Sequence, residues 1–65
     1  MTYRLQGIVT AVKRSETRQN IWYLTVEANG PIKVAVTKRY EVGDQVWLRR
    51  KSAVDFIFEV EGKVQ

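Results

Sequence analysis

The sequence predicts an all-β protein that forms a small five-stranded antiparallel barrel. In five segments apolar and polar residues alternate, and no segment spaces its apolar residues as an amphipathic helix does. Turns rich in Gly, Pro, Asn and Ser separate these segments. The 65 residues allow one domain, spanning 1–65. A sheet of this size must hide its edges, and closing into a barrel does so.

The first predicted strand covers residues 3–13 and changes character in its middle. One of its faces carries Tyr3, Leu5, Val9 and Ala11. After Gly7 the other face also becomes apolar, at Ile8 and Val12. Because a glycine inside a strand often marks a bulge or a sharp bend, we expect this strand to bend at Gly7 and to serve two sides of the barrel.

The second and third predicted strands form a hairpin. They read "IWYLTVE" and "IKVAVT", and the connecting "ANGP" contains Asn29-Gly30, the strongest short hairpin signal. The alternation predicts an inward set made of Trp22, Leu24, Val26, Ile32, Val34 and Val36. Tyr23 and Lys33 then face outward. The polar stretch "RSETRQN" before the hairpin predicts a loop.

Two further strands, "QVWLRR" and "FIFEVEGKV", complete the sheet. The preceding "KRYEVGD" is too short for a crossover helix, and Gly43 predicts a turn. Val46 and Leu48 face inward, so Trp47 faces outward, as Ile57 does on the last strand. The expected core consists of Leu5, Val9, Leu24, Val26, Val34, Val36, Val46, Leu48, Phe56 and Phe58.

Three short motifs occur in this order of strands: Gly7-Ile8-Val9, Gly30-Pro31-Ile32-Lys33-Val34 and Glu41-Val42-Gly43-Asp44-Gln45-Val46. With the bent first strand and the hairpin, they resemble an OB-fold of the replication protein A and anticodon-binding type, whose members bind single-stranded nucleic acid. The resemblance implies that strand 4 pairs with strands 1 and 5, and that a ligand groove crosses strands 2 and 3. Many OB-folds place a helix between strands 3 and 4. The chain has only residues 38–44 there, which leaves Tyr40 as a candidate cap for the barrel.

The charge of the chain is uneven. The formal net charge is +4, but residues 1–51 carry ten Lys and Arg against four acidic residues, and residues 52–65 carry one Lys against three. The first part is therefore +6 and the second −2. A basic body with an acidic last strand predicts an anionic partner bound away from that strand. A solvated surface with a modest excess of cations is the alternative.

The composition argues against an enzyme. The chain has no His for proton transfer at neutral pH and no Cys nucleophile or metal ligand. Asp55, Glu59 and Glu61 are close in sequence, but they lie toward a strand end and indicate a solvated acidic patch. We therefore expect no catalytic residue, no metal and no cofactor. Neither a signal peptide nor a membrane-spanning apolar segment is present in the sequence, so we expect a cytoplasmic protein with no membrane partner.

A basic groove with aromatic side chains is how proteins bind single strands with little sequence preference. Under the OB-fold resemblance, Tyr23 and Lys33 face outward on the groove, and the loops joining strands 1–2 and 4–5 flank it. The residues expected to bind nucleic acid are Lys13, Arg14, Arg18, Tyr23, Lys33, Lys38, Arg50 and Lys51. For Tyr23, a half-buried cross-strand position is an equal alternative. Lys38 serves either as groove wall or as part of the barrel cap.

A second surface is predicted on the outward side of strands 1, 4 and 5. Ile8, Trp47 and Ile57 would form an apolar patch there, and such patches mark association sites. We expect a homodimer or another protein to bind through Trp47. Two alternatives remain open: Trp47 and Arg49 form one surface with nucleic acid, or Trp47 is a single exposed residue stacked under Arg49.

The sequence therefore predicts a non-enzymatic OB-fold that binds single-stranded DNA or RNA with low sequence specificity. One alternative is a small β-barrel adaptor or oligomerisation module, whose basic charge is incidental. The other is an SH3-like barrel that binds duplex DNA, because "VGD" before a strand is also common in such barrels.

Overall fold

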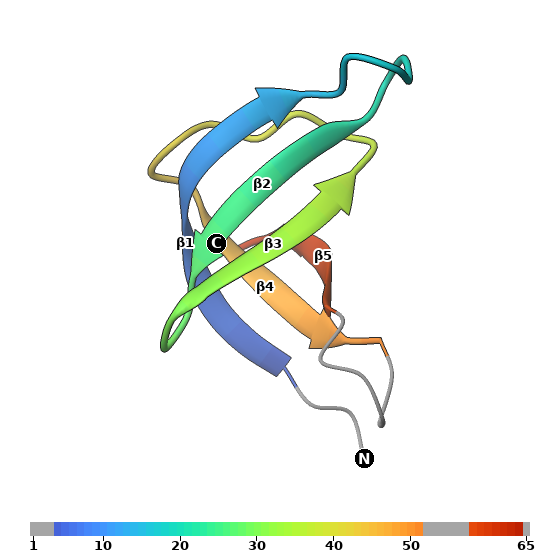
Figure 1. Cartoon of the computed structure of the whole chain (residues 1–65). Coiled ribbons are helices and arrows are strands. Elements are labelled where there is room, and N and C mark those ends of the chain that lie inside the picture. The colour runs from blue at the N-terminus through green and yellow to red at the C-terminus, as the bar shows by residue number, and fades with distance from the viewer. Residues whose placement is uncertain (1–3, 52–57, 65) are drawn as a thin grey trace.

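The computed structural model describes residues 4–51 and 58–64, which contain a single antiparallel sheet (Figure 1). Its strands are β1 (Arg4–Arg14), β2 (Trp22–Glu27), β3 (Pro31–Val36), β4 (Gln45–Arg50) and β5 (Phe58–Lys63). The described residues contain no helix. The prediction of a small all-β, five-stranded antiparallel barrel is confirmed.

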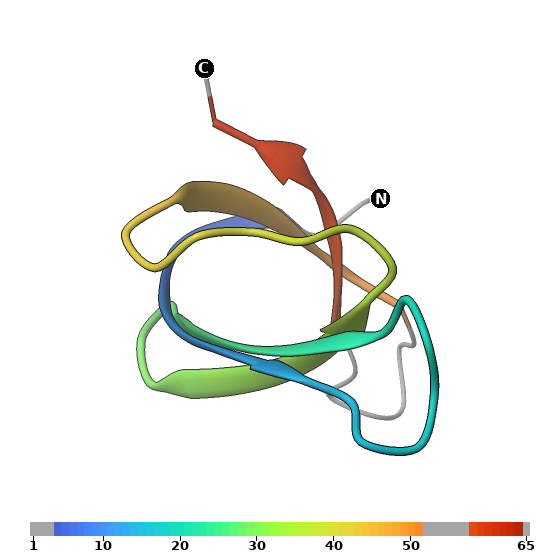
Figure 2. The same cartoon turned by 90° about the horizontal axis from the view of Figure 1, so that it is seen from above.

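The strand order is β3-β2-β1-β4-β5, so β4 pairs with both β1 and β5. These are the neighbours that the OB-fold resemblance implies. Seen from above, the strands curl around a common centre (Figure 2). The curl brings β3 into contact with β5, although these two strands form no hydrogen-bonded ladder within the described ranges. The barrel is therefore partly open along a seam between β3 and β5.

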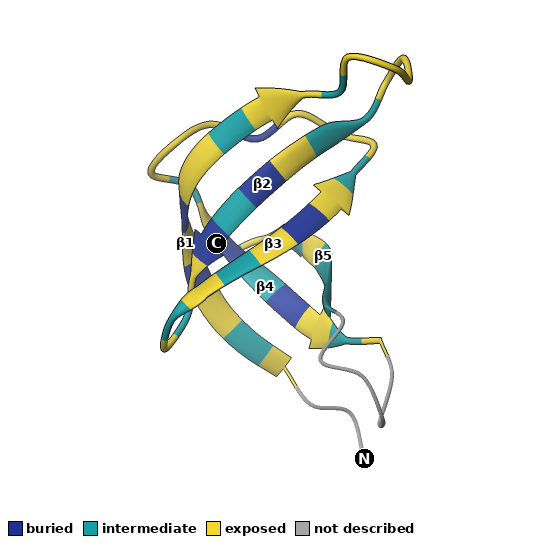
Figure 3. Cartoon of the chain, viewed as in Figure 1, coloured by how far each residue is buried: buried dark blue, intermediate teal, exposed yellow. Residues whose placement is uncertain are grey.

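The core follows the predicted alternation, visible as alternating buried and exposed bands along β2 and β3 (Figure 3). Six predicted core residues are buried: Val9, Leu24, Val26, Val34, Val46 and Leu48. Leu5, Val36 and Phe58 are only partly buried against this cluster. Phe56 lies outside the described residues. Tyr40, which is 5% exposed, joins the buried cluster and takes the role of barrel cap.

β1 serves two neighbouring strands, as predicted: residues 4–8 pair with β4 and residues 8–14 pair with β2. Its inward–outward alternation reverses at Thr10. The pairing with β2 slips between Val9 and Ala11, which is a β-bulge with Thr10 as the extra residue. Val9 is fully buried, whereas Ala11 is exposed and Val12 lies opposite Leu24. The prediction that Ala11 faces inward with Val9 was wrong, because one extra residue reverses the alternation of the strand beyond it.

Gly7 allows β1 and β2 to approach each other closely. A Cβ built on Gly7 would overlap Cγ1 of Val26 and would lie 3.1 Å from the carbonyl oxygen of Glu27. Val26 is fully buried and has no room to withdraw. Only glycine fits this position of the strand without displacing the neighbouring strand.

The turn before β4 docks on the bulge of β1. The Gly43 N–H donates to the Val9 carbonyl at 2.8 Å, and the Val9 N–H donates to the Asp44 carbonyl at 2.9 Å. Gly43 adopts φ +97°, a conformation that favours glycine. The "VGD" motif thus fixes the bend of β1 and carries residues 37–44 across the end of the barrel.

The hairpin predicted at Asn29-Gly30 is confirmed. β2 and β3 pair from Trp22 opposite Val36 to Glu27 opposite Pro31. The connection has three residues, 28–30, and both Asn29 and Gly30 have positive φ, 60° and 125°, which Asn and Gly adopt most readily.

Candidate nucleic-acid interface

The outward face of β1, β2 and β3 presents an exposed aromatic ring between a cation and a small residue. Tyr23 on β2 lies opposite Lys13 on β1 and opposite Ala35 on β3. All three are exposed, and Tyr23 keeps 47% of its surface accessible. Ala35 is too short to cover the phenol ring. Tyr23 thus lies at a cross-strand position with about half of its surface accessible, which leaves part of the ring open to a ligand.

The next row of this face adds a second cation and a second small residue. Thr25 on β2 lies opposite Ala11 on β1 and opposite Lys33 on β3. Lys33 and Ala11 are therefore the diagonal neighbours of Tyr23, within reach of a long side chain. We call the outward residues Ala11, Lys13, Tyr23, Thr25, Lys33 and Ala35 the basic face. Lys13 lies on the basic face because the bulge at Thr10 reverses the inward–outward alternation of β1.

The loop between β1 and β2 is ordered by one serine. The Ser15 hydroxyl accepts the N–H groups of Thr17 at 3.3 Å and of Arg18 at 3.1 Å. The Ser15 N–H donates to the Ile21 carbonyl at 2.9 Å, which closes the loop. This arrangement fixes the backbone that carries Arg18. The polar composition of this stretch predicts only a loop, and the signal for this turn is a Ser followed by polar residues.

Two predicted cations lie outside the basic face: Arg14 is the last residue of β1, and Lys38 lies in the segment that follows β3. Arg14 lies opposite Trp22, on the side of β1 that turns toward the barrel interior. Lys38 is exposed, and its Nζ is 5.9 Å from the centroid of the Tyr40 ring. Both therefore border the basic face at its edge and do not lie on it.

Arg50 and Lys51 lie at the other end of the barrel. A hollow of about 480 Å³ opens along the seam between β3 and β5, and both Lys33 and Arg50 line it. Its apolar walls include Leu5, Ile32 and Phe58. Lys51 is exposed directly after β4. Lys33 thus connects the basic face to the seam.

The outward face of β1, β4 and β5 is organised around Trp47. The Arg4 guanidinium lies over the Trp47 ring, 4.3 Å from its centroid, and the Arg4 Nε donates to Glu61 Oε1 at 2.9 Å. Trp47 is only partly exposed. Arg4, and not Arg49, stacks on this indole, and Arg49 lies opposite Arg4 on β1 and opposite Glu59 on β5. A joint surface of Trp47 and Arg49 for nucleic acid stays a prediction.

The predicted association surface also includes Ile8 and Ile57. Ile8 is 46% exposed and lies opposite Gln45, diagonal to Trp47. Ile57 lies outside the described residues. An association through this surface stays a prediction, and it would require a partner to pack on Arg4 as well as on Trp47.

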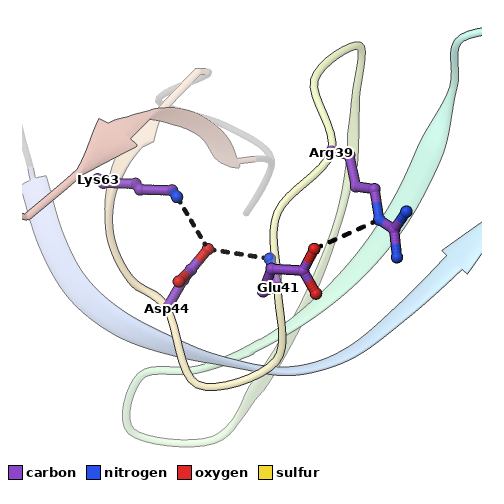
Figure 4. Close-up of polar contacts among 4 residues, drawn as sticks. All are labelled: Arg39, Glu41, Asp44 and Lys63. Atoms are coloured by element: carbon purple, nitrogen blue, oxygen red, sulfur yellow. Dashed lines mark hydrogen bonds and ion pairs between the residues drawn. The ribbon is translucent and has the colours of Figure 1, made fainter.

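Acidic groups near the β4 turn are held by local contacts (Figure 4). The Glu41 N–H donates to Asp44 Oδ2 at 2.9 Å, and Lys63 Nζ lies 3.4 Å from the same oxygen. The backbone hydrogen bond from Glu41 lowers the pKa of Asp44 below its ordinary value, and Lys63 lowers it further. Asp44 is therefore charged at neutral pH, and its carboxylate stabilises the turn before β4 through these two contacts.

Over residues 4–51 and 58–64, no three His, Cys, Asp or Glu side chains form a group able to hold a metal ion. In the same residues no helix has the length and apolarity needed to cross a membrane. Comparison of the chain with family models, with curated proteins and with solved structures found no match.

Proposed function

We propose that this protein binds single-stranded nucleic acid on the basic face, without catalysis and with little sequence preference. The observation that supports this most is Tyr23, an accessible ring bordered by Lys13, Lys33 and two alanines. Each nucleobase has a π-face that can stack on such a ring, whichever base it is. The lysines on either side are placed to neutralise the phosphates that flank a stacked base.

The cations at both ends of the barrel extend this binding path. Arg18 continues it over the ordered loop at one end, and Lys51 and the seam continue it at the other. A duplex keeps its bases paired and stacked, so it cannot use Tyr23 as a platform. The proposal therefore includes a preference for single strands over duplex.

The experiment is a fluorescence anisotropy titration of a labelled oligothymidylate with the intact protein and its variants. Tyr23→Ala should weaken binding by roughly 1–3 kcal/mol, the contribution of one base stacked on an aromatic ring. Tyr23→Phe, the matched control, keeps the ring and should bind like the wild type. The double variant Lys13→Gln, Lys33→Gln should flatten the slope of log affinity against log salt by about 1.4, since each phosphate contact contributes about 0.7 on single strands.

Binding that neither Tyr23→Ala nor the lysine pair alters would count against the basic face. In that case a protein-binding adaptor becomes the better interpretation of the barrel.

A further inference from the structure

A second hollow lies at the end of the barrel crossed by residues 37–44. Its volume is about 540 Å³, within the range of about 300–1,000 Å³ typical of ligand sites. Trp22, Tyr40 and Val42 supply its apolar walls, and Arg14 and Arg39 supply its cations. In a barrel with a helix between strands 3 and 4, a helix would occupy this end. Here a short irregular segment leaves the hollow open.

The two guanidinium groups at this hollow have few competing partners. The Arg14 guanidinium forms no hydrogen bond or ion pair with any residue of the described ranges. Arg39 has one ion pair, 3.6 Å from Nε to Glu41 Oε1, between side chains that are 66% and 69% exposed. Such an exposed pair is weak. Both arginines can therefore turn to a phosphate, which a guanidinium binds through two parallel hydrogen bonds.

The indole of Trp22 supplies a stacking surface in the same hollow. Trp22 is partly exposed, and its neighbours across the sheet are Arg14 and Val36. Within the described residues no guanidinium stacks on its ring, unlike that of Trp47. An aromatic ring beside two cations is the arrangement that binds a base together with its phosphate.

We propose that this hollow is a second nucleotide subsite, in which one base stacks on Trp22 and the adjoining phosphate binds Arg14 and Arg39. The inference rests on the proposed function, because it places a further nucleotide of the same strand. Tyr23 and Trp22 are consecutive residues that face opposite sides of β2. A strand that leaves the basic face at Tyr23 and bends over the barrel rim therefore reaches Trp22 next. Arg14 also lines a small hollow of the loop, together with Arg18 and Glu16, so two cations and one carboxylate lie along this path.

The test uses the fact that the chain has two tryptophans on different surfaces. In Trp47→Phe, Trp22 is the only indole, and in Trp22→Phe, Trp47 is the only one. Both proteins are titrated with an oligothymidylate of about 16 nucleotides, the upper site size for one OB-fold. Anisotropy of a labelled copy of the oligonucleotide reports binding independently of the indoles. We expect the Trp22 emission to be quenched with the same apparent Kd as the anisotropy, and the Trp47 emission to stay unchanged.

A matched pair of charge variants tests the phosphate contact. Arg14→Gln should flatten the salt slope by about 0.7, one phosphate contact on a single strand. Arg49→Gln removes the same charge from the outward face of β4 and should leave the slope unchanged. Oligonucleotide binding with constant Trp22 emission and an unaltered slope in Arg14→Gln would overturn the subsite and leave the basic face intact. No binding by anisotropy would overturn both.

Discussion

Tyr40→Ala should remove about 3–5 kcal/mol from the free energy of unfolding, as large-to-small substitutions of buried aromatic residues do. Tyr40 is 5% exposed and packs in the core from the 37–44 segment, where it closes the end of the barrel. An aromatic side chain buries about 150–250 Å², which at about 25 cal/mol per Å² is worth about 4–6 kcal/mol. Residual burial in the unfolded chain lowers this by about 10–40%, which agrees with the expected loss.

This loss is large beside the total stability of such a domain. At about 0.05–0.15 kcal/mol per residue, 65 residues give about 3–10 kcal/mol. Urea unfolding followed by tryptophan fluorescence should show Tyr40→Ala either unfolded in buffer or with a much lower midpoint. Tyr40→Phe, the matched control, keeps the ring in the core and should unfold near the wild-type midpoint. If Tyr40→Ala changed the free energy of unfolding by less than about 0.5 kcal/mol, as substitutions of surface residues do, the role of Tyr40 as barrel cap would be refuted.

Two further predictions concern the framework that carries the basic face. Gly7→Ala should destabilise the protein by about 1–3 kcal/mol through overpacking against Val26, and it should cost less in a Val26→Ala background; equal costs in a double-mutant unfolding cycle would argue against the close approach. Asp44→Asn should be less stable than the wild type at neutral pH. Because folding lowers the pKa of Asp44 from 3.8, this difference is complete above pH 3.8 and is lost as the pH falls through the lowered value. A difference in urea midpoint that is the same from neutral to strongly acidic pH would contradict the assigned role.

The alternation of the sequence was sufficient to predict most of the core. Leu24, Val34 and Leu48 are buried because a strand with one buried face has a strict two-residue period, which is a local property. The same period predicted that Tyr23 and Lys33 face outward. For this reason the centre of the basic face could be predicted before its neighbours were known.

The features that the sequence did not predict depend on contacts between distant residues. The turn at Gly43 forms hydrogen bonds with Val9 next to the bulge at Thr10, so the alternation of β1 alone does not reveal that Ala11 faces outward. Arg4 stacks on Trp47 because β1 and β4 are adjacent, and the sequence separation of the two residues conceals this. The pairing of Arg14 with Trp22 follows from the same bulge, which is why the hollow at the barrel end could not be predicted.

The central claim, that the basic face binds single strands, is tested most directly by comparing single-stranded and duplex forms of one labelled oligonucleotide at two salt concentrations. We expect the single strand to bind more tightly at both concentrations, with an affinity that falls as salt rises. The preference should shrink in Tyr23→Ala by roughly 1–3 kcal/mol, because one unpaired base loses its stacking ring. Duplex binding as tight as single-strand binding, or a preference of unchanged size in Tyr23→Ala, would contradict the account.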